Sequence, residues 1–293
     1  MNSLRNIVKA ISKYLPWSIQ DRIVFILKLG YFPKIKNAAT FNEKVLFRKQ
    51  HRMLDIKYSC LSDKFLVRGY VSRLIGDSYF VPLMFYTDSP EALSNYCPSC
   101  DIIIKPNHGA GMYRIVRASR YDAEVKEIIE LCNKWLLTDF SHVQREIHYR
   151  NIPRKILVEK LLGDGRIAPT DYKFHMFRNG EGEFNFVLQI INERFSGRLS
   201  RTFYVNNFDA PFDTESRATV DSAPDDLHKV DKRLALEALR LSRLLAADFD
   251  YVRVDWYIHG GAIYFSELTF TPAAGFGVGY GMRLDKLMGE FWV

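Results

Sequence analysis

The feature that most constrains the fold is the stretch "YVRVDWYIHGGAIYFSELTF", residues 251–270. Its β-branched and aromatic runs flank two glycines, a pattern that predicts a β-hairpin. Each run carries one acid among apolar neighbours, Asp255 and Glu267. A two-residue loop at 260–261 would put the two acids on opposite faces. A three-residue loop at 260–262, with the bulge that glycines permit, would put them directly opposite each other on one face.

Two carboxylates on one face repel each other, so one takes up a proton unless a cation lies between them. Mg²⁺ prefers oxygen ligands and usually keeps substrate phosphates among them, so it would stabilise the pair. The alternative is one solvent-facing acid on each strand. The two carboxylates alone favour that alternative, and the choice depends on the rest of the chain.

The composition describes a globular protein with a large core. The chain has 293 residues, 47% of them hydrophobic and 26% charged, which suits one large domain or two to three lobes. No run approaches the roughly eighteen apolar residues of a membrane span. The N-terminus interrupts its apolar residues with charges and lacks a cleavage site, so we expect no signal peptide and a cytoplasmic protein, with contact at the inner face of the membrane as an option.

The charge is unevenly distributed. Residues 1–75 hold 15 Lys and Arg against 4 Asp and Glu, a net charge of +11, whereas the whole chain has +7. This basic third indicates an anionic partner such as nucleic acid, acidic lipid or acidic sugar. A solvated basic face explains the charge equally well.

Helical and strand patterns alternate along the chain. Five segments have helical spacing: 4–15, 42–54, 62–76, 122–140 and 229–245. Thr40 or Asn42 can cap the second, Gly76 can end the third, and Asp122 can open the fourth. Strands are predicted at 78–86, 101–106 and 154–162, with a hairpin at 171–195 around Asn-Gly-Glu-Gly. Because several strand pairs are hairpins, we predict an α+β fold rather than a doubly wound parallel sheet.

Three further motifs suit a nucleoside triphosphate. The stretch "IIIKPNHGAGMYRIV" is a strand ending in Lys105 and followed by a glycine loop that lets the backbone approach an anion. Lys173 lies inside the aromatic strand "DYKFHMF", although a lysine there can also protect a sheet edge. In "ILVEKLL" a core strand meets a loop at Glu159, where backbone groups can read a base. Together with Asp255 and Glu267, these residues are the types that bind a nucleoside triphosphate with magnesium.

These motifs resemble the ATP-grasp superfamily, most closely the TupA-like family. The resemblance rests on "LSDKFLVRGYV", "IIIKPNHGAG", "ILVEKLL", "DYKFHMF" and "VRVDWYI…YFSELTFTPAAGF", and covers the chain from about "FNEKVLFRK" onward. It implies two α+β lobes that clamp ATP between antiparallel sheets. We accordingly expect a helical, basic N-terminal region on the acceptor side (1–95), an N-lobe with the phosphate-covering loop (96–158) and a C-lobe with the magnesium site (159–293).

The resemblance also implies roles for single residues. Lys105 and Lys173 match the phosphate-contacting lysines, and Asp255 and Glu267 match the magnesium ligands. The flexible loop over the phosphates corresponds to Asn107, His108, Gly109, Ala110 and Gly111, and the adenine hinge to Glu159, Lys160 and Leu161. The chain departs from many ATP-grasp enzymes at Thr269, where they carry Asn.

By the same resemblance, the reaction is ATP-dependent amide formation through an acyl phosphate, which needs positioning and charge stabilisation but no protein nucleophile. TupA-like proteins are associated with bacterial surface polysaccharides, so the expected partners are an acidic glycan or lipid-linked saccharide precursor and an amino acid or other amine, rather than nucleic acid. Candidate γ-phosphate or acceptor ligands are Arg194 and Arg201. The candidate acceptor cradle is Lys44, Arg48, Lys64 and Arg68, in pairs four residues apart.

Two alternatives remain open at this point. An ATP-grasp kinase could use the same cleft to phosphorylate a sugar hydroxyl. A non-catalytic protein could bind acidic glycans through the basic third alone, although the complete set of lysines and acids argues against it.

Overall fold

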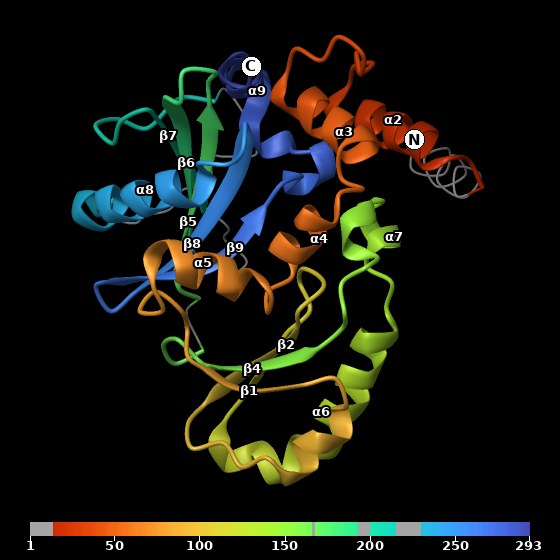
Figure 1. The fold of residues 1–293 in the computed structure, drawn as a ribbon, viewed down its shortest axis with the longest axis vertical. Helices are drawn as coiled ribbons and strands as arrows, with labels where there is room; N and C mark the ends of the chain where they lie inside the picture. Colours follow the sequence, from red (N-terminus) through yellow and green to blue (C-terminus); the bar gives the residue numbers. More distant parts are fainter. Residues whose placement is uncertain (1–13, 166–167, 193–199, 215–229) are drawn as a thin grey trace.

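The computed structural model describes residues 14–165, 168–192, 200–214 and 230–293 (Figure 1). Its two antiparallel sheets lie in separate lobes, a larger one above and a smaller one below in Figure 1. The α+β prediction is therefore confirmed. None of the described helices is long and apolar enough to cross a membrane.

The larger sheet has five strands in the order β7-β6-β5-β8-β9, and every neighbouring pair is antiparallel. Both predicted hairpins are present, as β5–β6 and β8–β9. One face of the sheet packs on α8 and α5 through a large apolar core. The bounds are β5 (Thr170–Arg178), β6 (Phe184–Asn192), β7 (Ser200–Val205), β8 (Tyr251–His259), β9 (Ala262–Thr269), α5 (Val67–Ile75) and α8 (Lys232–Ala246).

The β8–β9 hairpin brings its two acids together by a route that differs from the expected one. The loop has two residues, 260–261, both with positive φ, as a tight hairpin turn requires. A register shift after Asp255 places an extra residue, Ser266, in β9, so that Asp255 pairs with Glu267. The predicted pairing is confirmed and the three-residue loop is wrong, because the bulge lies inside the strand rather than at the turn.

The opposite face of the larger sheet carries α3 (Phe41–His51) and α9 (Gly281–Phe291). Phe41 lies at the centre of an aromatic cluster that joins these helices to the sheet. Thr40 caps α3 in a capping box with Glu43, which confirms one of the two predicted caps. This cluster covers one end of the face and leaves the other end to polar side chains.

The smaller sheet has the strand order β1-β4-β2-β3, and α6 covers one of its faces. It includes β1 from within residues 1–95 and the end of β4 beyond 158, so it extends past the expected range of 96–158. The helix α6 begins at Tyr121 with Arg120 at its N-cap, so the prediction that Asp122 caps it is wrong. The bounds are β1 (Leu83–Thr87), β2 (Ile102–Pro106), β3 (Arg114–Val116), β4 (Ile156–Lys160) and α6 (Tyr121–Leu137).

The described residues from 14 to 75 are mostly helical, whereas β1 lies in the last part of the expected helical range of 1–95. Most of the predicted helix 4–15 lies outside the described residues. The predicted helix 62–76 is wrong in its first turn, because the chain breaks at Asp63. The Asp63 carboxylate accepts the N–H groups of Phe65 (2.7 Å) and Leu66 (3.3 Å), which ends one helix and starts the next. Gly76 ends α5 as predicted. The remaining elements are α2 (Trp17–Leu29), α4 (Ile56–Ser62), α7 (Ser141–Gln144) and the 3₁₀ turns Pro90–Asn95, Ala118–Arg120, Ile147–Tyr149, Pro272–Gly275 and Val278–Tyr280.

Candidate active site

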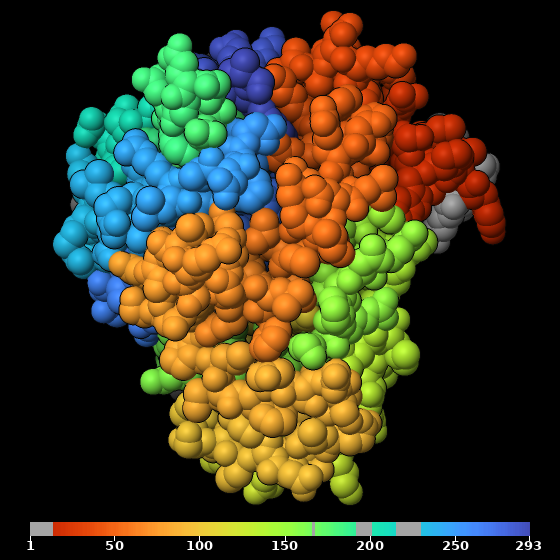
Figure 2. All heavy atoms as spheres, in the orientation of Figure 1, coloured from red at the N-terminus to blue at the C-terminus, as the bar shows by residue number. Residues whose placement is uncertain are grey.

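A cleft of about 1130 Å³, including the solvent at its mouth, lies between the two sheets. The smaller lobe contributes Lys105 and Glu159, and the larger lobe contributes Lys173 and Glu267. In the space-filling view, the segment that contains α4 and α5 runs across the junction of the lobes (Figure 2). The fold thus brings Lys105, Glu159, Lys173 and Glu267, which are far apart in the sequence, to one cleft.

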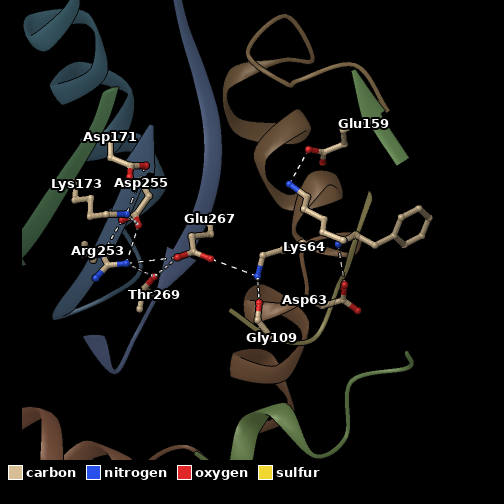
Figure 3. A network of polar contacts seen from close by, with 12 residues as sticks. Asp63, Lys64, Gly109, Glu159, Asp171, Lys173, Arg253, Asp255, Glu267 and Thr269 are labelled. Carbon is tan, nitrogen blue, oxygen red and sulfur yellow. Dashed lines mark hydrogen bonds and ion pairs between the residues drawn. The ribbon is translucent and has the colours of Figure 1, made fainter. Parts of the chain in front are cut away.

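Three charged residues form a row across the larger sheet. Lys173 in β5 is the register partner of Asp255 in β8, which is the register partner of Glu267 in β9. Lys173 Nζ donates to Asp255, whose side chain is fully buried (Figure 3). The row lies on the face that α8 leaves free, because the alternate residues of these strands belong to the core.

Arg253 supplies the cation that two adjacent carboxylates need. Its guanidinium donates two hydrogen bonds of 2.7 Å to Asp255 and lies 3.4 Å from Glu267 and 3.1 Å from the hydroxyl of Thr269. Burial raises the pKa of Asp255, but Arg253 and Lys173 outweigh burial and hold that pKa below its usual value. Both acids are therefore charged without a proton between them. Our sequence reasoning missed this residue, although an arginine two positions before a strand acid shares its face.

Lys105 of β2 is paired across the smaller sheet with Glu159 of β4, with Nζ 2.6 Å from Oε2. Burial lowers the pKa of Lys105, but Glu159, together with Tyr257 and Glu267, more than reverses the effect and keeps the ammonium charged. The N–H groups of Lys160 and Leu161 already donate to Pro82 (3.0 Å) and Asp101 (2.9 Å). The expected hinge therefore lines the cleft, but these two backbone donors are occupied within the smaller lobe.

Lys64 also reaches the cleft, and it links three parts of the molecule. Its Nζ donates to the carbonyl of Gly109 (2.6 Å) in the glycine loop and lies 3.4 Å from Glu267 Oε2 (Figure 3). It lies between α4 and α5 rather than on a helix, so the expectation that Lys64 and Arg68 share a helical face is wrong. The break at Asp63 turns its side chain toward the cleft instead.

The loop after β2 divides into an anchored part and a cleft-lining part. Gly109, Ala110 and Gly111 line the cleft. Asn107 and His108 are fully buried away from it, which corrects their assignment to the phosphate-covering loop. The Asn107 amide donates to Asp63 (2.9 Å) and Pro153 (2.9 Å), so it fixes the base of the loop. Burial lowers the pKa of His108, so it adds no positive charge.

The other predicted cradle residues do not line the cleft. Lys44 donates to the carbonyl of Trp292, and Arg48 stacks on the Trp292 ring (4.2 Å) and donates to Tyr251 (2.7 Å). Both line a separate hollow beside the C-terminal helix, because α3 packs against α9. Arg68 lies over the Phe80 ring at 4.1 Å. Of the predicted acceptor cradle, only Lys64 lies in the cleft.

The two predicted catalytic arginines are not brought to the cleft by the described structure. Arg201 lies in β7 and packs beside Gly279, and it does not line the cleft. Arg194 lies outside the described residues. The arginine that contacts the acids of the charged row is Arg253.

The apolar walls of the cleft were also missing from our sequence reasoning. One signal was present in "IIIKP", because the residue two before Lys105 must share its face. Apolar side chains near the hinge suit a planar base, whereas the lysines suit its phosphates. The apolar lining is Val81, Ile103, Met112, Ile115, Leu161 and Leu162.

The oxygen atoms of Asp255 and Glu267 are of the type that Mg²⁺ prefers, and two carboxylates would suffice for an ion that keeps water and phosphate among its ligands. Asp255 and Glu267 are both charged, and Thr269 donates to Glu267 at 3.3 Å, so hard oxygen donors lie together. Among the described residues, no group of three or more acids, histidines and cysteines could hold a metal by itself. Mg²⁺ usually needs only one or two carboxylates, with phosphates and water completing its octahedron.

Two antiparallel sheets that enclose a cleft of lysines, paired acids and a glycine loop define an ATP-grasp protein. The family model described as TupA-like ATPgrasp matches residues 43–293, and the chain belongs to that family. The resemblance read from the sequence is thereby confirmed. No relative was found among curated proteins.

Solved structures with a similar fold include the D-alanine-D-alanine ligase of Helicobacter pylori, with 14% identity, a TM-score of 0.49, and coverage of 79% of this chain and 60% of that enzyme. The D-alanine–D-alanine ligase of Bacillus anthracis has 13% identity, a TM-score of 0.40, and coverage of 81% and 68%. The N5-carboxyaminoimidazole ribonucleotide synthetase of Thermus thermophilus has 15% identity, a TM-score of 0.41, and coverage of 80% and 55%. The chain thus spans less than two thirds of the first and third enzymes. At these identities the likeness concerns the fold alone.

Proposed function

We propose that this protein forms an amide between the carboxylate of a hexuronic acid and an amino acid or other amine, in a bacterial surface polysaccharide or its precursor. ATP activates the carboxylate as an acyl phosphate, and the amine then displaces phosphate. The observation that carries the proposal is the meeting of Lys64, Lys105, Lys173 and Glu267 in one cleft of a TupA-like ATP-grasp chain.

The cleft chemistry supports activation by charge stabilisation. The three lysines come from separate segments and point into one volume, so they can neutralise a triphosphate together. We therefore assign Lys64 to the phosphates rather than to the acceptor. Glu267 and Asp255 would hold Mg²⁺, which neutralises phosphate oxygens and the developing charge.

Arg253 supports the acyl-transfer step. It contacts both acids, at 2.7 Å from Asp255 and 3.4 Å from Glu267, and a small fraction of its side chain, 12%, is exposed. A guanidinium held by two carboxylates is a fixed donor, which suits stabilisation of an oxyanion on the attacked carboxyl carbon. The amine needs to lose a proton during attack, and bulk solvent at the open mouth can accept it.

The test is ADP release from ATP and Mg²⁺ against a panel of uronic acids and amines. The proposal requires release that depends on both co-substrates and a product in which the two are joined, detected by mass spectrometry. Arg253→Lys keeps the charge but loses the two-pronged contact with Asp255, so it should lower kcat more than it raises the KM for ATP. A phosphorylated sugar formed without any amine would instead identify a kinase and overturn the ligase proposal.

A further inference from the structure

The helix α2 has an unusual outer face. Its inner face is fixed to the protein by Phe25 in an apolar cluster and by Asp21, which is buried and paired with Lys49 (2.9 Å) and Arg145 (2.5 Å). The outer face should then be polar, as on most surface helices. Instead it presents Ile19 and Ile26, each 39% exposed, and helix α2 has few charged residues.

The residues on either side of α2 also expose large apolar side chains. Tyr14 is 93% exposed just before the helix, and Phe32 is 65% exposed just after it. Figures 1 and 2 show α2, in dark red, at one edge of the molecule beside α3, where it extends away from the two lobes. Exposed apolar residues scattered singly are ordinary, but several within one short segment at an edge indicate a contact surface.

The charges on this segment have one sign. Between residues 14 and 36 the exposed charged residues are all basic, namely Arg22, Lys28, Lys34 and Lys36. The acid in this range, Asp21, is 1% exposed and already paired, so it contributes no negative surface. Exposed isoleucines and aromatic rings beside cations are typical of helices that lie in the headgroup region of an anionic bilayer.

We propose that α2 and its flanks, residues 14–36, dock the protein on the surface of an anionic phospholipid membrane. Ile19 and Ile26 enter the boundary between headgroups and acyl chains, and Arg22 lies between them on the same helical face, where it meets lipid phosphates. The basic flanks add attraction that depends on ionic strength. The inference is independent of the proposed reaction, because it uses none of the cleft residues.

The experiment is co-sedimentation of the full chain with vesicles of phosphatidylcholine alone or mixed equally with phosphatidylglycerol. We expect binding to the mixed vesicles that weakens with added salt, and little binding to phosphatidylcholine. The double variant Ile19→Ser/Ile26→Ser should weaken binding by about tenfold or more. Arg22→Ser should weaken it by about fivefold, the effect of one cation near an anionic leaflet. Unchanged far-UV circular dichroism would verify the fold of each variant.

A matched control comes from α8, which also exposes two leucines beside arginines but has an exposed acid at each end, Asp231 and Asp248, whereas the exposed charged residues of α2 and its flanks are all basic. Leu236→Ser/Leu244→Ser removes side chains that are 59% and 44% exposed and should leave vesicle binding unchanged. Equal losses for the α8 and α2 pairs, or equal binding to both kinds of vesicle, would overturn the proposal. So would a dimer in sedimentation equilibrium that the α2 variant dissociates, because the surface would then belong to a second copy.

Discussion

Asp255 and Glu267 are both candidate magnesium ligands, yet their replacement should affect stability very differently. Asp255 is fully buried and is bound by Arg253 through two hydrogen bonds and by Lys173 through one. Removing one partner of a buried ion pair costs about 3–5 kcal/mol. Two weaker contacts remain for the cations in Asp255→Asn, since Glu267 lies 3.4 Å from Arg253 and Asp171 lies 3.8 Å from Lys173. We therefore expect the lower end of the range, about 3 kcal/mol.

Glu267 is held less tightly. Its side chain is 27% exposed, and its contacts with Lys64 and Arg253 are both 3.4 Å. Partly exposed pairs of this length contribute about 1 kcal/mol or less. For a chain of this size, about 2–4 °C of melting temperature corresponds to 1 kcal/mol. Asp255→Asn should therefore lower the melting temperature by about 10 °C, and Glu267→Gln by a few degrees at most.

Both variants should nevertheless lose ATP turnover, because each removes a negative oxygen that we propose as a ligand of Mg²⁺. The assay combines thermal melting in the absence of nucleotide with ADP release at a temperature where both variants remain folded. Equal destabilisation by the two substitutions would refute the view that Asp255 is the main counterion of the cluster. Turnover that survives in Asp255→Asn would refute its role as a metal ligand.

Three further outcomes are expected. Lys105→Met and Lys173→Met should each lower kcat by at least about 100-fold while the circular dichroism spectrum stays unchanged, because each removes a phosphate-facing charge; near-normal turnover in both would contradict the phosphate assignment. Burial raises the pKa of Glu146 to about 7 from the usual 4.5, so the folded chain retains a proton there and its unfolding free energy should fall as pH rises through that window, by about 3 kcal/mol at most. Urea unfolding at several pH values should show that this slope is smaller in Glu146→Gln, and an unchanged slope would exclude Glu146 as its source. Gly289→Ala would place a methyl carbon 2.0 Å from the Ala39 carbonyl oxygen, so chemical denaturation should show a loss of roughly 2–3 kcal/mol, and a loss near zero would mean that α9 can shift.

The sequence predicted the larger sheet well because its signals are local. Hydrophobic alternation fixed the strands, and the Asn-Gly-Glu-Gly and Gly-Gly turns fixed the hairpins. The pairing of Asp255 with Glu267 was predicted correctly, but it was attributed to a three-residue loop, whereas it results from a bulge inside β9. Ile263 and Phe265 both face the core, so strict alternation would also have buried Glu267, and the extra residue at 266 turns it to the cleft. A bulge of this kind depends on packing across the sheet and leaves no clear mark in a single strand.

The basic residues of the N-terminal region were predictable as charges but not as contacts. Spacing of four placed Lys44 and Arg48 on one helical face, as the structure has them, yet that face packs against the C-terminal segment more than two hundred residues away. Long-range packing of this kind cannot be read from periodicity. Lys64 reached the cleft for an equally non-local reason, since Asp63 ends one helix and also accepts from Asn107 across the lobes.

Three of the lysines that line the cleft are neutralised by acids of the same chain. Buried charges are costly unless they are paired, so these pairs stabilise the cleft before any ligand binds. A triphosphate can replace the acids as partners of the lysines, but Glu159 then loses its lysine, and Asp255 and Glu267 keep Arg253 as their shared cation beside a new negative charge. A divalent cation removes that second problem. The pairs are Lys64 with Glu267, Lys105 with Glu159, and Lys173 with Asp255.

This exchange of partners predicts strong coupling between ATP and Mg²⁺, for which Glu267 is the sharpest probe. Without metal, an ATP that attracts Lys64 leaves the partly buried Glu267 carboxylate with only its 3.4 Å contact to Arg253, which is shared with Asp255, and this opposes binding. Glu267→Gln removes that repulsion, so it should bind metal-free ATP more tightly than the unaltered chain does. Added Mg²⁺ should raise the ATP affinity of this variant less than it raises that of the unaltered chain. A coupling free energy of about 1–3 kcal/mol between ATP and Mg²⁺ corresponds to a change of about 5–150-fold in ATP affinity. Isothermal titration calorimetry of ATP with magnesium or with a chelator measures both affinities. Weaker metal-free binding in Glu267→Gln than in the unaltered chain would show that Glu267 does not face the phosphates, because a carboxylate that repels them cannot also assist them.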